Sequence, residues 1–305
     1  MIGENTLISL LHYHKKFFNA VVDTEIVIAK KGFKKNNIIS VFQHKTKRDT
    51  KIIYQNQDNW VMKNGDAVNI FTSDEIENLV KKLKLQSKPL SEYANVYAGL
   101  VAYEEGKGNP PQTRGMMKAK CYNLDFQKDG TYRKVLKGAD INKYVNNWNG
   151  KRWLKYGINL AAPRNQKIFD QEKIVVRQTG DSLIATLDNQ KFVCLKNIHI
   201  INAKDGVNLK LLLGLINSKL LNFYFQYLNP EIGETLAEVK KENVEKLLIK
   251  IPENQQSIIN CVNQILSIKK ENSTAEISDL EKRIDRLVYK LYELEEHEIK
   301  LIENQ

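Results

Sequence analysis

The segment formed by residues 163–201 contains several short β-branched runs that are separated by turn residues. The runs cover residues 173–177, 182–187, 191–195 and 198–201. Gly180-Asp181 and Asp188-Asn189 stand between the first three runs, and such turn pairs predict an antiparallel meander. The first turn is preceded by Arg177–Thr179, whose side chains are donors suited to phosphates and base edges.

Helical patterns surround this β-rich middle. Ser73 precedes an apolar stripe at helical spacing over residues 76–83, which predicts an N-capped helix. Residues 209–227 predict one continuous helix, in which the small Gly214 and Ser218 would allow close packing. Pro252 is placed in the first turn of a further helix.

The last helices complete an α+β prediction. The periodic segments 276–293 and 295–302 predict two more helices, and Glu281, Asp285 and Arg286 are expected on a solvated outer face. The predicted domains are residues 1–57, strand-rich; 58–88, a helical bridge; 89–230, a β-rich recognition domain; and 231–305, a helical scaffold.

Positive charge is concentrated in the middle of the chain. Residues 101–200 hold 18 Lys and Arg against 9 Asp and Glu, whereas residues 201–305 hold 14 against 17. A basic middle next to a mildly acidic end predicts a surface that faces a polyanion and a separate structural part.

Aromatic and basic residues alternate over residues 132–156. The aromatic members are Tyr132, Tyr144, Trp148, Trp153 and Tyr156. Interleaving of this kind suits nucleic-acid binding, in which cations meet phosphates and aromatic rings stack or wedge. The alternative is that the rings form the core of a β-rich domain and the lysines are solvated. The Asn149-Gly150 turn would place Lys151 and Arg152 just after a hairpin end.

Two features of the first 57 residues have a structural and a functional interpretation. The basic residues of segment 30–51 either protect the edge of a sheet or contact DNA phosphates. His12 and His14 would share one strand face, but a surface or core role is favoured over metal binding because no third ligand follows nearby.

The loop formed by residues 104–113 contains Asn109-Pro110-Pro111, the first three residues of the Asn-Pro-Pro-aromatic motif of amino-methyltransferases. That motif stacks a flipped adenine on its aromatic residue, and here the fourth residue is Gln112. No glycine-rich cofactor loop precedes it in this sequence. The segment is therefore interpreted as a DNA-contacting loop with Lys107 and Arg114.

Targeting and redox signals are absent from the sequence. The first residues lack the features of a signal peptide, and the most apolar stretch, 209–221, is interrupted by polar residues. The three cysteines have no CxxC spacing, which favours a reducing compartment and disfavours a zinc site. A cytoplasmic protein without a membrane anchor is expected.

Several segments taken together carry a family resemblance. They are 132–140 (YRKVLKGAD), 173–181 (KIVVRQTGD), 211–225 (LLLGLINSKLLNFYF), Ile251-Pro252 with Gln255-Gln256, and 284–292 (IDRLVYKLY). In order and spacing they resemble the TaqI-like C-terminal specificity domain of restriction–modification adenine-specific DNA methyltransferases of Type II or IIG. Residues 18–24 resemble the last strands of the methyltransferase domain, so the chain is expected to begin partway through a larger protein.

The resemblance implies a DNA target-recognition module that is not catalytic by itself. S-adenosylmethionine, and magnesium if a nuclease is attached, would be bound by the parent protein, and the partners would be double-stranded DNA and a methyltransferase domain in cis or on another subunit. The expected DNA-binding residues are Lys107, Arg114, Lys118, Lys120, Arg133, Lys151, Arg152, Lys155, Arg164, Arg177 and Gln178.

Three other interpretations stay open. The chain could be the specificity subunit of a multi-subunit Type I system, although such subunits usually have two recognition halves and this sequence has one. It could be a methyltransferase with a degenerate motif, which detectable binding of S-adenosylmethionine would reveal. A basic structural protein would bind DNA without sequence preference.

Overall fold

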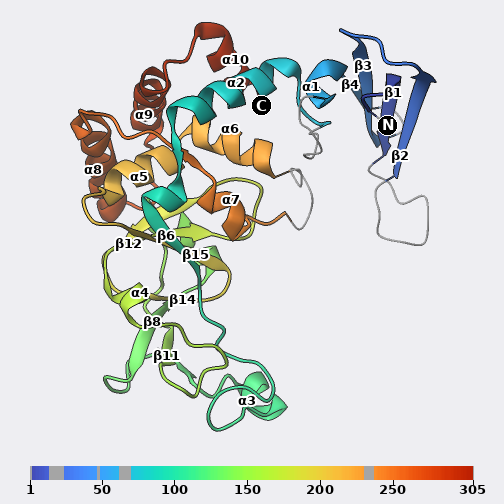
Figure 1. The fold of residues 1–305 in the computed structure, drawn as a ribbon. Coiled ribbons are helices and arrows are strands. Elements are labelled where there is room, and N and C mark those ends of the chain that lie inside the picture. The colour runs from blue at the N-terminus through green and yellow to red at the C-terminus, as the bar shows by residue number, and fades with distance from the viewer. Residues whose placement is uncertain (1, 14–23, 47–48, 62–69, 230–236, 305) are drawn as a thin grey trace. The chain divides into compact units, whose positions relative to one another are not determined.

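The computed structural model describes residues 2–13, 24–46, 49–61, 70–229 and 237–304, and it divides into two compact units (Figure 1). Unit 1 comprises residues 1–82 and unit 2 comprises residues 83–305, so the boundary falls inside helix α2 (Asp74–Gln86). Ser73 begins this helix as predicted, because its Oγ accepts a hydrogen bond from the Ile76 backbone N–H at 3.4 Å. Strands and helices both contribute substantially, which confirms the α+β class.

Unit 1 is built on a four-stranded sheet in the order β2-β1-β3-β4. The strands are β1 (Asn5–Tyr13), β2 (Thr24–Lys31), β3 (Ile38–Thr46) and β4 (Asp49–Asn56), followed by the short helix α1 (Gln57–Val61). β1 pairs antiparallel with β2 and parallel with β3. Alternate residues such as Ile39, Val41 and Ile53 point to one face, where they pack with Trp60 of α1.

The basic residues of β2 and the His12 side chain have positions that fit structural roles. β2 is an edge strand and its Lys30 and Lys31 are exposed, as edge protection requires. The His12 side chain is buried, with Nδ1 3.3 Å from Glu25 Oε1 and its ring edge-on to Phe71. His14, residues 18–23, Lys47 and Arg48 lie outside the described residues.

Unit 2 contains two four-stranded sheets. The first, in the order β13-β12-β15-β6, is antiparallel and consists of β6 (Ala94–Ala98), β12 (Lys173–Arg177), β13 (Ala185–Asp188) and β15 (Ile198–Ala203). The second, in the order β14-β8-β11-β7, consists of β7 (Asn123–Leu124), β8 (Tyr132–Leu136), β11 (Trp153–Lys155) and β14 (Val193–Cys194). Val175 and Ile200 of the first sheet share one buried core with Val135 and Leu154 of the second.

Several short elements complete the part of unit 2 around these sheets. They are the strand pairs β5 (Lys88–Pro89) with β16 (Leu248–Ile249) and β9 (Ile141–Asn142) with β10 (Val145–Asn146), the 3₁₀ turns Leu90–Glu92 and Gly138–Asp140, and helices α3 (Arg114–Ala119) and α4 (Lys167–Asp170).

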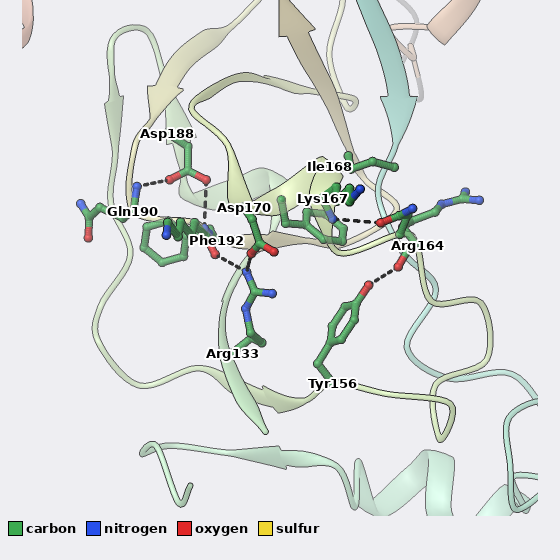
Figure 2. Close-up of polar contacts among 12 residues, drawn as sticks. Arg133, Tyr156, Arg164, Lys167, Ile168, Asp170, Asp188, Gln190 and Phe192 are labelled. Carbon is green, nitrogen blue, oxygen red and sulfur yellow. Dashed lines mark hydrogen bonds and ion pairs between the residues drawn. The ribbon is translucent and has the colours of Figure 1, made fainter. Parts of the chain in front are cut away.

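The predicted meander is wrong at one strand. β12 pairs with β13 as predicted, but β14 leaves the sheet and pairs in parallel with β8, and β15 pairs with β12 instead of with β14. The redirection starts at Asp188, whose carboxylate accepts hydrogen bonds from the backbone N–H groups of Gln190 at 2.8 Å and Phe192 at 3.0 Å (Figure 2). This side-chain turn carries the chain away from β13 and into the second sheet.

The helical part of unit 2 packs against the first sheet. Its helices are α5 (Leu209–Ile216), α6 (Lys219–Leu228), α7 (Lys241–Glu245), α8 (Gln256–Glu271), α9 (Ser278–Leu291) and α10 (Glu296–Glu303). α5 is buried along most of its length and packs against β12 and β13 as well as against α8 (Figure 1). A methyl group added at Gly214 would lie 2.8 Å from Ile258, so the close approach that was predicted at Gly214 is confirmed.

The single helix predicted over residues 209–227 is wrong, because the chain breaks at Asn217-Ser218. The Ser218 hydroxyl caps α6 by accepting a hydrogen bond from the Leu221 N–H at 3.3 Å. The Asn217 amide bonds to both the N–H and the C=O of Ala185, at 3.1 and 3.0 Å. Polar partners from the sheet therefore stabilise a break that apolar spacing does not reveal.

Two expectations for the C-terminal helices need correction. α8 begins at Gln256, so Pro252 precedes the helix by several residues and does not lie in its first turn. Asp285 on α9 is buried, where it accepts a hydrogen bond from the Lys219 N–H at 2.9 Å, and it does not belong to a solvated face. Burial raises the Asp285 pKa. None of the helices in the described ranges has both the length and the apolar character needed to cross a membrane.

Candidate nucleic-acid interface

One end of unit 2 is formed by two segments that are distant in sequence. Asn109 N–H donates to the Ile158 carbonyl at 2.8 Å, and Lys155 N–H donates to the Tyr122 carbonyl at 2.9 Å. We call residues 104–124 together with residues 155–160 the tip. Figure 1 shows α3 of the tip at the end of unit 2 opposite to α8 and α9.

Helix α3 of the tip has no buried residue. An isolated helix of this length is marginal in water, so local bonds must hold it. The Thr113 hydroxyl accepts a hydrogen bond from the Met116 N–H at 3.3 Å, and the left-handed Lys120 ends the helix at φ 47°. Met116 and Met117 are partly buried, whereas the charged side chains of α3, Arg114 and Lys118, are exposed and available to a ligand.

Two stacked tyrosines support the chain after α3. The Tyr103 and Tyr122 rings lie 5.8 Å apart at an interplanar angle of 6°. The Tyr103 hydroxyl donates to Asn123 Oδ1 at 2.6 Å and accepts from the Tyr122 N–H at 2.9 Å. Burial raises the pKa of Tyr103 to about 12.

Five of the eleven predicted DNA-binding residues lie on the tip, and all five are exposed. They are Lys107, Arg114, Lys118, Lys120 and Lys155. They come from three elements, the loop 104–113, α3 and β11, which the hydrogen bonds described above hold together. The structure thus brings together cations that the sequence placed up to 48 residues apart.

Two predicted arginines are engaged inside unit 2. Arg133 donates to Asp170 Oδ1 at 2.7 Å and to the Lys191 carbonyl at 3.1 Å, and it lies over the Tyr156 ring (Figure 2). Arg152 pairs with Asp140 and donates to the Val135 carbonyl at 3.3 Å. Both side chains are less than one fifth exposed, so DNA would have to share guanidinium groups that are already bonded. Their DNA contacts stay predictions.

The other four predicted residues lie outside the tip. Lys151 is exposed after the Asn149-Gly150 turn, and its N–H bonds to Asn149 Oδ1 at 3.0 Å. Arg164 Nε donates to the Ala98 carbonyl at 3.2 Å. Arg177 Nε donates to Thr179 Oγ1 at 3.1 Å, and the Gln178 backbone bonds to Asn197 and Val239.

The aromatic residues of segment 132–156 contribute mainly to the core. Tyr132 and Tyr144 are buried, and Trp148 and Tyr156 pack against the core between the two sheets. Lys134 lies over the Trp148 and Phe192 rings at 5.6 Å from each centroid. The interleaved pattern therefore places rings inside and several cations outside.

The Asn-Pro-Pro segment belongs to a closed surface loop. Gln112 is buried, and its amide donates to the carbonyls of Ala102 at 2.9 Å and Asn159 at 2.8 Å. Its Oε1 accepts from the Glu104 N–H at 3.0 Å. Gln112, which stands in the place of the catalytic aromatic residue, thus stabilises the loop through its side-chain hydrogen bonds.

Replacing Gln112 with alanine should unfasten this loop. The change leaves one N–H and two carbonyl groups without their partner, which should cost about 1–3 kcal/mol. Hydrogen exchange of the amides of residues 104–113 should accelerate, while exchange in β12 and β15 should change much less. Unchanged protection of the loop amides would show that Gln112 does not hold them.

Sequence reasoning missed two features of the site. α3 was not predicted, since its only strong signal is Thr113 at the N-cap and Gly115 weakens the helical pattern. Glu105 was also missed, although its carboxylate bonds to Arg114 Nε at 2.9 and 2.8 Å. Within the described ranges, no cluster of three or more His, Cys, Asp or Glu side chains could hold a metal ion.

Comparisons with known proteins match part of the chain to a family model. Residues 133–249 match the model of the TaqI-like C-terminal specificity domain, which confirms the resemblance for that stretch. A structure of the Type IIL restriction–modification enzyme MmeI in complex with DNA is similar to the chain with a TM-score of 0.52 and 10% identity, over 96% of this chain and 44% of that chain. At this identity the likeness is one of fold.

Two further solved structures are more distant. The Type IIG restriction endonuclease BpuSI matches with a TM-score of 0.45 and 13% identity, over 95% of this chain and 44% of that one. The HsdS subunit from Thermoanaerobacter tengcongensis matches with a TM-score of 0.35 and 14% identity, over 72% of this chain and 51% of that one. The chain thus spans less than half of the MmeI and BpuSI chains, and no curated protein matches its sequence.

Proposed function

We propose that this chain, which carries a TaqI-like specificity domain in residues 133–249, is the DNA target-recognition module of a restriction–modification enzyme. The observation that carries the proposal is the tip, where five exposed cations stand on a helix and loops beside the matched domain. A helix without a buried side chain, flanked by lysines, suits the major groove of duplex DNA.

Affinity and sequence specificity would come from two different kinds of contact. Lys107, Lys118 and Lys120 are exposed, so they suit phosphates and would supply affinity that falls with salt. Base edges would be read by arginine and amide side chains that the fold holds in fixed positions. Gln112 contributes indirectly, because it fixes the loop that carries Lys107.

The second part of the proposal is a partner domain, and an apolar sheet face of unit 1 supports it. On the sheet face opposite its core, Ile26, Leu11, Phe42 and Ile52 are register partners that form an apolar row across all four strands. Ile26 is 48% exposed and Ile52 is 46% exposed. A partly exposed apolar row across a whole sheet face suits packing against further protein.

The proposed partner is an adenine N6-methyltransferase domain, in cis or on another subunit. That domain, and a nuclease if one is attached, would bind S-adenosylmethionine and magnesium. The chain described here would place it on its target sequence, and would not perform methyl transfer itself.

Equilibrium binding to duplex DNA tests the recognition function. The 305-residue chain should select one motif from a randomised duplex library and bind it about 10³-fold or more tightly than an unrelated duplex. Binding of all duplexes with equal affinity at physiological salt would support a basic structural protein and contradict the proposal.

Cofactor binding tests the division between recognition and catalysis. The chain alone should not retain labelled S-adenosylmethionine in equilibrium dialysis, because the proposal assigns the cofactor to the partner domain. Saturable binding of one molecule per chain would instead favour a methyltransferase with a degenerate motif.

A further inference from the structure

Among the described residues of unit 2, three arginines form ion pairs with carboxylates, and one of these pairs differs from the others in exposure. The Arg133–Asp170 and Arg152–Asp140 pairs have arginine side chains that are 18% and 19% exposed. In the Arg114–Glu105 pair the two side chains are 81% and 53% exposed. An ion pair in such a place contributes little to stability, so its main physical effect is to orient the guanidinium group.

The Arg114–Glu105 geometry uses one edge of the guanidinium. Arg114 Nε donates to both Glu105 oxygens, at 2.9 and 2.8 Å. Both of these contacts are made through Nε, and the two terminal nitrogens form a fork of donors at the other end of the group.

The backbone that carries this pair is fixed. Gly106 N–H donates to the Gln112 carbonyl at 2.9 Å, and Gln112 N–H donates to the Lys107 carbonyl at 2.8 Å. Glu105 and Arg114 therefore stand at the two ends of a loop that is closed by backbone bonds and by the buried Gln112 side chain. A fork held in this way loses little conformational freedom when it binds.

We propose that Arg114 reads a guanine in the major groove and that Glu105 is its positioning residue. The terminal nitrogens of Arg114 would donate to guanine O6 and N7, the commonest specific arginine contact. This assignment rests on the proposed DNA-recognition function, and it gives a specific role to one side chain and a new role to Glu105.

Charge distinguishes a guanine from a phosphate as the target. Glu105 lies next to the Arg114 guanidinium and is half exposed, so a phosphate bound there would face a carboxylate of like charge. At a G·C pair the carboxylate meets no such repulsion, and it can accept a hydrogen bond from the cytosine amino group. The neutral Arg114–Glu105 pair is therefore better suited to base edges than to the DNA backbone.

Motif selection with point variants tests this inference. The 305-residue chain and its Arg114→Gln, Arg114→Lys and Glu105→Gln variants would each select binding sites from one randomised duplex library. All three variants should lose the preference for guanine at the same single position, with about 10- to 100-fold weaker binding to the wild-type site. Arg114→Lys is included because it keeps the charge but loses the fork.

Salt dependence separates base reading from phosphate contact. Lys118→Gln should weaken binding to all sequences and reduce the slope of log K against log salt by about 0.9, whereas Arg114→Gln should leave the slope nearly unchanged. Arg286→Gln on α9 makes the same charge change on an exposed residue outside the tip and should alter neither property.

The outcomes keep the two proposals apart. If the wild-type chain selects a motif and Arg114→Gln selects the same motif, the role of Arg114 is refuted and DNA recognition stands. The role of Glu105 is refuted if Glu105→Gln keeps the full guanine preference. If the wild-type chain selects no motif, the proposed function fails and this inference fails with it.

Discussion

Replacing Lys173 with methionine should destabilise unit 2 by about 3–5 kcal/mol, because the change leaves a buried carboxylate without its cation. Lys173 Nζ lies 2.5 Å from Asp188 Oδ2, and both side chains are 0% exposed. Lys173 Nζ also donates to the Phe169 carbonyl at 2.7 Å. Lys173 and Asp188 are register partners at one end of the β12–β13 pair. Asp188 is also the residue after which the chain turns toward the second sheet.

The interior around this pair is strongly shielded from water. Cys194 is fully buried nearby, and burial raises the pKa of its thiol. A lone charge in such a place has no solvent to compensate it, which is why loss of one partner costs far more than the pair contributes. Urea unfolding followed by tryptophan fluorescence would measure the change through the transition midpoint at constant m value.

Two controls make the Lys173 prediction specific to burial. Glu105→Gln removes one partner of an exposed pair and should cost less than about 1 kcal/mol. The Lys173→Met/Asp188→Asn double variant removes both charges and should be more stable than the Lys173→Met variant, giving a large coupling energy in a double-mutant cycle. A Lys173→Met variant as stable as Glu105→Gln would show that the buried charge is compensated in another way.

Replacing Lys107, Lys118 and Lys120 together with glutamine should weaken DNA binding on the order of 100-fold near physiological salt. Each phosphate contact releases about 0.9 counterions, so the slope of log K against log salt should become less steep by about 2–3. The three side chains are exposed, so the folded structure should be kept. Fluorescence anisotropy with a labelled duplex over a range of salt concentrations would provide both quantities.

A matched triple variant controls for net charge. Lys282, Arg283 and Arg286 are exposed on α9, and their replacement with glutamine removes the same charge from the opposite end of unit 2. Its affinity and salt slope should stay close to those of the wild-type chain. An equal loss in both triple variants would mean that DNA responds to net charge and not to the tip.

Much of the local structure was predictable because it depends on neighbours in the sequence. The Ser73 cap and the apolar stripe after it predicted α2, and periodicity predicted α9 and α10. The β-branched run 173–177 became β12 as expected. Three of the segments that carried the family resemblance, 132–140, 173–181 and 211–225, overlap the stretch that the specificity-domain model matches, and the other two lie beyond its end at residue 249.

Three of the errors share one cause, which is a polar side chain whose hydrogen bonds or ion pair the apolar pattern does not reveal. Asp188 redirects β14 through bonds to Phe192 and Lys173, and Asn217 breaks the helix through bonds to Ala185. Asp285 is drawn into the interior by the Lys219 N–H. Apolar periodicity contains no information about such partners, so it predicted a regular strand, one helix and a solvated face.

The sequence by itself determined the class of fold, several helices, the basic middle and the resemblance of residues 133–249 to a TaqI-like specificity domain, because composition, periodicity and motif order are properties of the linear chain. Only the tertiary structure decided which cations are available. It engaged Arg133 and Arg152 with Asp170 and Asp140, and it left Arg114 exposed beside Glu105. All three arginines are paired with a carboxylate, and the physical reason for the difference is that packing of distant segments buries the Arg133 and Arg152 side chains while leaving Arg114 exposed.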